Sequence, residues 1–186
     1  MIWTEGDVPW FLSMGGNLLV CDNITAWNWH GDERAPGLSC SDFACASEVE
    51  QYVGTVSVGE RRALVLGGEP LPTRLWADPA RQNEYFVIRQ MRGNDQALGA
   101  MLNKLPRFSF TAEGIELTFS DSLLRLLDAA KTMQPGKHGK PEITLQIAPG
   151  RYYVSTCHYL PDVLTYFIVH RLRRIANNMS SERALP

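Results

Sequence analysis

Turn-forming residues interrupt this sequence at short intervals, as in Gly67-Gly68-Glu69-Pro70 and Arg92-Gly93-Asn94. The apolar runs between such turns are long enough for strands, but most are too short for helices. The 186 residues contain no internal repeat and no long linker rich in glycine, serine or proline. These features predict a single α+β domain over residues 1–186, made mainly of antiparallel β-sheet with two or three short helices.

Several of the apolar runs alternate with polar residues, as expected of strands that bury one face. In residues 142–147, for example, Ile143, Leu145 and Ile147 alternate with polar side chains. With 151–159 and 164–172, this run predicts a C-terminal antiparallel meander, in which Pro149-Gly150 forms the first turn. Further strands are expected at 17–21, 52–58, 62–66, 85–91, 107–111 and 115–120.

Two segments have the periodicity of helices. Residues 95–105 place apolar side chains at helical spacing, and Asp95 is expected to cap this helix. Residues 42–51 are expected to form a shorter helix that Ser41 caps. Residues 123–133 fit either a helix or a long edge strand.

Motifs of catalysis and cofactor binding are missing from the sequence. There is no G-x-S-x-G, the turn at 67–70 lacks the lysine of a phosphate loop, and the four cysteines do not have the spacing of a zinc site. We therefore expect no catalytic residue, cofactor or metal. The alternative is a small cytosolic hydrolase or ligand-binding enzyme that uses Cys45, His158 or His170 in a pocket, and a third hypothesis is a subunit of a larger assembly.

Charge is distributed unevenly along the chain. Residues 1–60 hold nine acids and one base, a net charge of -8, whereas the remaining residues carry +6. An acidic segment disfavours nucleic acid as a partner and favours a basic protein. The N-terminus lacks the pattern of a secretory signal, and no apolar run is long enough to span a membrane, so we expect a cytoplasmic protein that does not bind membranes.

An unusual segment places Trp27 and Trp29 beside the acids Asp32 and Glu33. Exposed tryptophan next to charge is typical of a binding hot spot, but one of the two rings could instead belong to the core. The expected helix at 42–51 adds further acids to the same part of the chain. The sequence thus predicts a partner-binding surface made of Trp27, Trp29, Asp32, Glu33, Asp42, Glu48 and Glu50.

Short motifs spread along the chain also form a signature. They include Gly15-Gly16, Ser41-Asp42-Phe43-Ala44-Cys45-Ala46, Tyr52-Val53-Gly54, Gly67-Gly68-Glu69-Pro70, Thr73, Pro149-Gly150-Arg151-Tyr152, Tyr159 and His170-Arg171-Leu172. Over most of the chain, this pattern resembles the immunity protein 21 family. Within it, the resemblance marks Gly15, Gly16, Asp42, Cys45, Tyr52, Gly54, Gly67, Glu69, Pro70, Thr73, Gly150, Tyr152, Tyr159 and His170.

The resemblance implies the antidote half of a bacterial toxin–immunity pair, which acts in interbacterial competition by binding and blocking a cognate toxin. It implies a protein that is not an enzyme and has one dedicated protein partner. Because most signature positions are glycine, proline, aromatic or aliphatic residues, we expect them to hold turns and core in place. The partner would then bind elsewhere, on the acidic surface.

Overall fold

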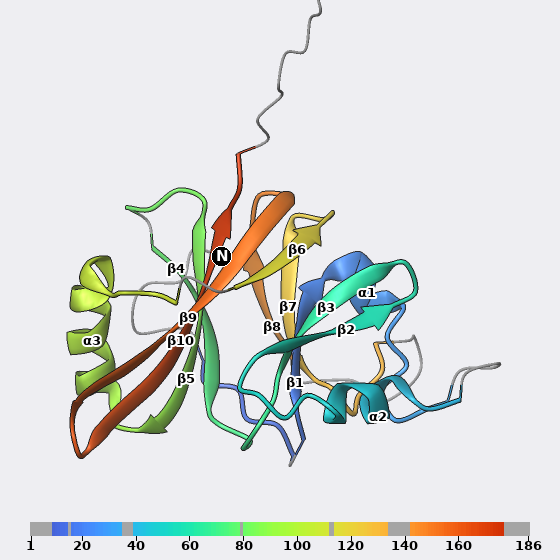
Figure 1. Cartoon of the computed structure of the whole chain (residues 1–186), viewed down its shortest axis with the longest axis horizontal. Helices are drawn as coiled ribbons and strands as arrows, with labels where there is room; N and C mark the ends of the chain where they lie inside the picture. The colour runs from blue at the N-terminus through green and yellow to red at the C-terminus, as the bar shows by residue number, and fades with distance from the viewer. Residues whose placement is uncertain are drawn as a thin grey trace, which may run out of the picture.

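Two five-stranded antiparallel sheets pack face to face, with helices on the outer side of each (Figure 1). The computed structural model describes residues 9–14, 16–34, 39–78, 80–111, 114–133 and 142–176. In these residues the fold is α+β and mainly β, which confirms the expected class.

Each sheet is named here after its central strand. The β1 sheet has, in spatial order, β2 (Gly54–Val58), β3 (Arg61–Leu66), β1 (Leu18–Asp22), β7 (Leu123–Asp128) and β8 (Glu142–Gln146). The β10 sheet has β4 (Thr73–Ala77), β5 (Glu84–Arg92), β10 (Thr165–Arg174), β9 (Gly150–Asp162) and β6 (Ile115–Phe119). All pairings are antiparallel.

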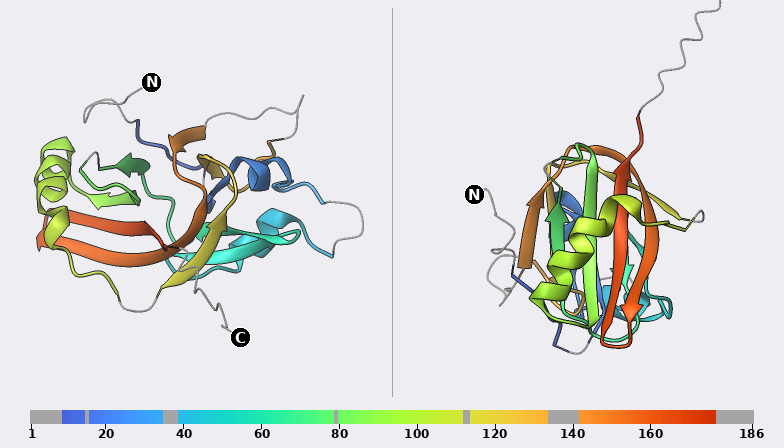
Figure 2. Two further views of the ribbon diagram at one scale, coloured as in Figure 1. Left: turned by 90° about the horizontal axis from the view of Figure 1, so that it is seen from above. Right: turned by 90° about the vertical axis from the view of Figure 1, so that its left-hand side faces the viewer.

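The helices cover the two outer faces, so that the chain forms layers (Figure 2). Helices α1 (Asn23–Trp27) and α2 (Asp42–Ser47) lie over the β1 sheet, and α3 (Asp95–Lys104), continued by a 3-10 turn at Leu105–Arg107, lies over the β10 sheet. Strand β1 is buried on both faces: Leu18 and Val20 point between the sheets, whereas Leu19 and Cys21 face the helices. This is why its sequence is a continuous apolar run without alternation.

Side chains cap the N-terminus of each α-helix. Ser41 accepts a hydrogen bond from the Ala44 amide at 3.1 Å, as expected. The cap of α3 is Asn94 and not Asp95, because Asn94 has the extended backbone of a cap while Asp95 is already helical. Helix α1 was not expected; it has only five residues, and its periodicity is too short to detect.

The C-terminal meander was predicted incorrectly. Strands β9 and β10 form the expected hairpin, but β8 pairs with β7 in the other sheet. The segment around Pro149-Gly150 therefore passes from one sheet to the other instead of making a hairpin turn. Alternation reports which face of a strand is buried, but not which strand lies beside it.

Three other segments clarify or correct the expectations. Residues 123–128 form strand β7, which settles the choice between helix and strand. Residues 107–111 are not a strand; Phe108 and Phe110 instead extend over the outer face of the β10 sheet, where they pack with the α3 core cluster. Strand β4 was missed because Arg74 interrupts its apolar run, although that side chain is buried.

A buried arginine joins the two sheets. Arg89, on β5, directs Nη1 to the carbonyl oxygens of Tyr52 at 3.0 Å and Gly67 at 2.9 Å, and Nη2 to that of Glu69 at 2.9 Å. Tyr52 lies just before β2, while the other two acceptors follow β3. Burial lowers the pKa of the guanidinium to about 10, so it stays charged at neutral pH and its charge is stabilised by carbonyl oxygens.

Replacing Arg89 with methionine should lower the free energy of unfolding by about 3 kcal/mol or more, because three carbonyl oxygens lose a charged donor. Arg89→Lys should recover only part of this loss, since an ammonium group cannot spread its donors as a guanidinium does. Urea unfolding would measure both, with exposed Arg173→Met as the control. A loss below about 1 kcal/mol in Arg89→Met would refute this role.

Candidate partner-binding surface

The acidic residues expected to bind a partner lie on the outer side of the β1 sheet, around α1 and α2. We call this the α1–α2 face and define it by Trp27, Asp32, Glu33, Glu48 and Glu50. Trp27, at the end of α1, exposes 45% of its surface. Asp32 and Glu33 are exposed in the following turn, and Glu48 and Glu50 are exposed just after α2. These positions bring one aromatic ring and four carboxylates to the helical side of one sheet.

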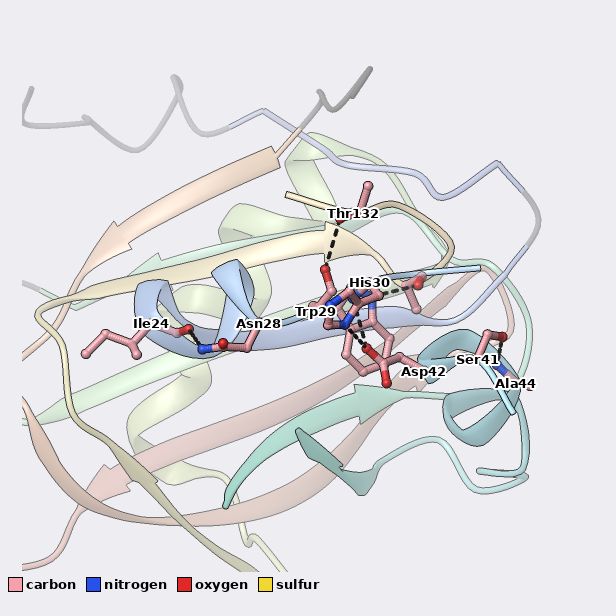
Figure 3. A network of polar contacts seen from close by, with 9 residues as sticks. Ile24, Asn28, Trp29, His30, Ser41, Asp42, Ala44 and Thr132 are labelled. Carbon is pink, nitrogen blue, oxygen red and sulfur yellow. Dashed lines mark hydrogen bonds and ion pairs between the residues drawn. The ribbon is translucent and has the colours of Figure 1, made fainter. Parts of the chain in front are cut away.

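Trp29 does not belong to this exposed set. It is 0% exposed and packs in the core between the helices and the β1 sheet. Its Nε1 donates to the carbonyl oxygen of Ala129 at 2.8 Å, and its own carbonyl accepts from Thr132 Oγ1 at 3.1 Å (Figure 3). Of the two alternatives for the tryptophan pair, the structure therefore supports one core ring and one surface ring, and Trp29 is removed from the candidate surface.

Asp42 fastens the loop after α1 to the start of α2. Its Oδ2 accepts from the His30 amide at 2.8 Å and lies 3.3 Å from His30 Nδ1 (Figure 3). Its side chain is only 13% exposed. A backbone bond from the Phe43 amide to the Gly31 carbonyl reinforces the connection. Asp42 thus positions the α1–α2 face and offers little surface to a partner.

The Gly31 backbone requires glycine. Its φ is +65°, and a Cβ atom there would lie 2.5 Å from the Ala130 carbonyl oxygen. The next amide, of Asp32, donates to that same oxygen at 3.1 Å. The turn that presents Asp32 and Glu33 is therefore held close to the end of β7, and its position is defined by backbone contacts.

The segment that supplies the α1–α2 face is acidic, while exposed Lys131 lies beside it, directly after Ala130, whose carbonyl accepts from the Asp32 amide. The described residues between Asn23 and Glu50 include five acids and a single base, Arg34. Arg34 donates to the Ser39 carbonyl. The excess of acids over bases gives this segment a net negative charge, which would attract a basic protein surface.

Most signature positions of the resemblance have structural roles in the described residues, while Gly15 lies outside them. Gly67 leaves no room for a side chain, because a Cβ would lie 2.4 Å from the carbonyl oxygens of Val49 and Gln51. A Cβ on Gly54 would lie 2.6 Å from Val49 Cγ1. These glycines allow the segment before β2 to pack against the turn after β3, where Arg89 binds both.

The remaining signature residues are distributed through the fold. Gly16 lies against the Phe43 ring, Thr73 pairs through its backbone with Phe11, and Tyr159 stacks on Phe108 at 5.0 Å between ring centroids. Tyr152 is buried between the sheets, and burial raises its pKa. Glu69 and Pro70 have exposed side chains at the turn before β4, where Glu69 contributes only its carbonyl to Arg89.

The structure does not bring the residues of the alternative enzyme hypothesis together. Cys45 packs on the helical side of the β1 sheet, whereas His170 is buried on the central strand of the other sheet. His158 Nδ1 lies 2.8 Å from the Tyr166 hydroxyl at the surface. A cleft of about 540 Å³ between the β2–β3 turn and β6 is lined by none of the three. Within the described ranges, no three His, Cys, Asp or Glu side chains are grouped to hold a metal ion.

One exposed apolar group was not anticipated from the sequence. The turn of the β9–β10 hairpin exposes 53% of Leu160, 79% of Val163 and 77% of Leu164. We call these three residues the hairpin tip. Apolar residues on both sides of Pro161-Asp162 were the available signal, since a turn places its flanking side chains in solvent.

In its described residues, the protein is a two-sheet α+β sandwich with an acidic segment on one outer face and no assembled catalytic group. The sequence profile described as immunity protein 21 matches residues 9–165, and the chain belongs to this family. The match confirms the resemblance and ends where β10 begins, so His170 lies beyond it. No curated protein and no solved structure matches the chain. None of the helices in the described part is long and apolar enough to cross a membrane.

The buried position of His170 makes the stability of the fold depend on pH. Burial, with the nearby charge of Arg89, lowers the pKa of this imidazole to about 3, and its Nδ1 lies 2.9 Å from Thr156 Oγ1. The unfolded chain takes up a proton on His170 below about pH 6.5, whereas the folded chain does not until far lower pH. The buried neutral ring therefore costs no stability above about pH 6.5. Below it, the free energy of unfolding falls by about 1.4 kcal/mol per pH unit until the folded chain also takes up the proton, near pH 3.

His170→Asn should make the free energy of unfolding less dependent on pH than it is in the wild type. Urea titrations from about pH 6.5 to about pH 4.5 would measure the slope, and the difference between the two proteins should change by about 2 kcal/mol over this range. Gln96→Asn, at an exposed position, is the control and should keep the wild-type slope because it changes no titratable group. Identical slopes for His170→Asn and wild type would contradict the lowered pKa.

Proposed function

We propose that this immunity protein neutralises a cognate toxin that acts in the cytoplasm by covering a basic surface of the toxin domain. The observation that carries the proposal is the α1–α2 face, where four carboxylates and a tryptophan are exposed on the helical side of one sheet. Nucleases are one class of toxin with such a surface, because they bind phosphates through lysine and arginine. An acidic protein on that surface would exclude the nucleic acid.

The position of the charges fits this mode of inhibition. Asp42 and Gly31 fix the turn and the helix start through short contacts, so the acids would meet a partner with little reordering. Trp27 would supply an apolar anchor on the same side of the sheet as the charges, and an aromatic anchor with polar neighbours is the usual composition of an interface hot spot. The long-range field would mainly accelerate association, while Trp27 would slow dissociation.

Charge reversal tests the acidic face. Replacing Asp32, Glu33, Glu48 and Glu50 together with lysine should reduce the association rate by at least about tenfold at low salt, because electrostatic steering is reversed. The partner would be the toxin domain encoded beside this protein's gene, and stopped-flow fluorescence at several salt concentrations would measure the rates. Wild type should associate more slowly as salt rises.

A matched control changes the net charge equally at exposed positions elsewhere. It carries lysine at Gln82, Asp95, Gln96, Asn103, Ser109 and Glu116. This variant should bind much faster than the four-acid variant. Equal association rates for the two variants would show that only net charge matters and would remove the α1–α2 face from the proposal. If the wild-type protein does not bind the toxin domain at all, the proposed function itself is wrong.

We include the hairpin tip as a second, apolar contact. Tyr52, which follows Glu50 closely in sequence, lies 6.0 Å from His158 between ring centroids, and His158 is on β9 shortly before the tip. The ring contact thus places the end of the acidic segment beside the strand that leads to the tip. Apolar side chains that are exposed to this extent are favourable anchors when a partner removes them from water.

Replacing Leu160, Val163 and Leu164 with serine should raise the toxin dissociation rate by at least about tenfold and leave the salt dependence of association unchanged. Surface plasmon resonance would separate the two rates. Leu12→Ser with Met14→Ser removes exposed apolar groups at another site and serves as the control. If both variants dissociate at the wild-type rate, the tip is not part of the contact.

A further inference from the structure

Two thiols meet at the start of α2. The Sγ atoms of Cys40 and Cys45 are 2.6 Å apart, and both side chains are partly buried. Cys40 precedes the cap residue Ser41, and Cys45 lies in the first turn of the helix.

These two positions form a known local motif of helix starts. The residue before the cap and the fourth helical residue often make an apolar contact, called a hydrophobic staple, that fixes the direction in which the chain enters the helix. Cys40 and Cys45 occupy these positions, while Ser41 caps the Ala44 amide. Sulfur atoms in this staple need to approach by only about another 0.5 Å to reach the length of a disulfide bond.

We propose that Cys40 and Cys45 form a modification site, a dithiol that closes reversibly to a disulfide in exchange with a small disulfide such as oxidised glutathione. The disulfide converts the staple of α2 from a contact into a covalent bond. This inference concerns the chain's own chemistry and does not depend on a toxin.

The exchange is balanced in two steps. The Cys40 thiolate attacks one sulfur of glutathione disulfide, forming a mixed disulfide and releasing one glutathione. Cys45 sulfur, as it gives up its proton, then attacks Cys40 sulfur and releases the second glutathione. Two protein thiols are oxidised and one glutathione disulfide is reduced to two thiols, which take up the two protons.

Cys40 is the better candidate for the first attack. Its contact with Cys45, together with burial, raises the pKa of the Cys45 thiol to about 11, which keeps that thiol protonated at neutral pH. The acids Glu48 and Asp42 act in the same direction. Cys45 therefore serves as the resolving thiol, because it needs to react only after the mixed disulfide has formed beside it.

The helix is a suitable place for such a bond to have an effect. Helix α2 has only six residues, and helices of that length depend on contacts outside themselves. A bond between the residue before its cap and its first turn restricts both the helix and the segment leading into it. Amide exchange in α2 should slow when the bond forms, and Tm should rise by about 5 °C.

Mass spectrometry tests the site directly. The full chain would be equilibrated with mixtures of reduced and oxidised glutathione, alkylated and cleaved with trypsin. Both cysteines fall in one tryptic peptide, between Arg34 and Arg61, so closure appears as a peptide lighter by two hydrogen atoms that resists alkylation. Tm and amide exchange would be followed on the same samples.

Single variants distinguish closure from general thiol reactivity. Cys40→Ser and Cys45→Ser should each lose the light peptide and the rise in Tm, whereas Cys157→Ser should keep both. The proposal is overturned if both thiols remain open to alkylation in excess oxidised glutathione, if the disulfide that forms involves Cys21 or Cys157, or if closure leaves Tm and α2 exchange unchanged.

Discussion

The guanidinium of Arg89 is the interaction on which the arrangement of the two sheets depends. It extends from β5 and binds the carbonyl oxygens of two segments that enter and leave the other sheet. A buried cation is costly unless its donors are satisfied, so the segments that supply those carbonyls must keep their positions. Glycine is required at positions 54 and 67, because a Cβ atom at either would collide with the segment before β2. Two positions of the motifs noted in the sequence, Gly54 and Gly67, thus lie where the chain packs closely around Arg89.

The local features of the fold could be predicted from sequence better than its long-range pairings. Ser41 as a helix cap, the helix near Asp95 and most strands follow from short-range patterns, because capping, periodicity and turns depend on neighbouring residues. The partner of β8 could not be predicted, since Ile143 and Ile147 indicate a buried face without indicating which sheet supplies it. The hydrogen bonds of Arg89 could not be predicted for a related reason. A charged residue inside an apolar strand does not reveal which distant carbonyls it will meet.

The candidate surface shows the same division. Composition located the acids of the first sixty residues, and the structure places Asp32, Glu33, Glu48 and Glu50 in solvent around the two helices. Composition could not tell the exposed Trp27 from the buried Trp29, because their exposure depends on their positions at the end of a short helix that was not expected. Nor could composition distinguish Asp42, which is mostly buried and bonded to His30, from the carboxylates that are exposed. Charged residues can be counted from the sequence, whereas the exposure of each side chain depends on the folded structure.

The order of strands has a consequence for when protection can begin. Strand β10 is the last in the described chain, yet it lies at the centre of its sheet, between β5 and β9. The β1 sheet is likewise completed by β7 and β8, which are made long after β1 and β3. Three of the eight strand pairings, β1–β7, β5–β10 and β6–β9, therefore join N-terminal or central strands to strands made much later, and they cannot form until those later strands have left the ribosome. A chain that stops before β10 leaves β5 and β9 without the strand that pairs with both, so we expect a truncated antidote to protect poorly.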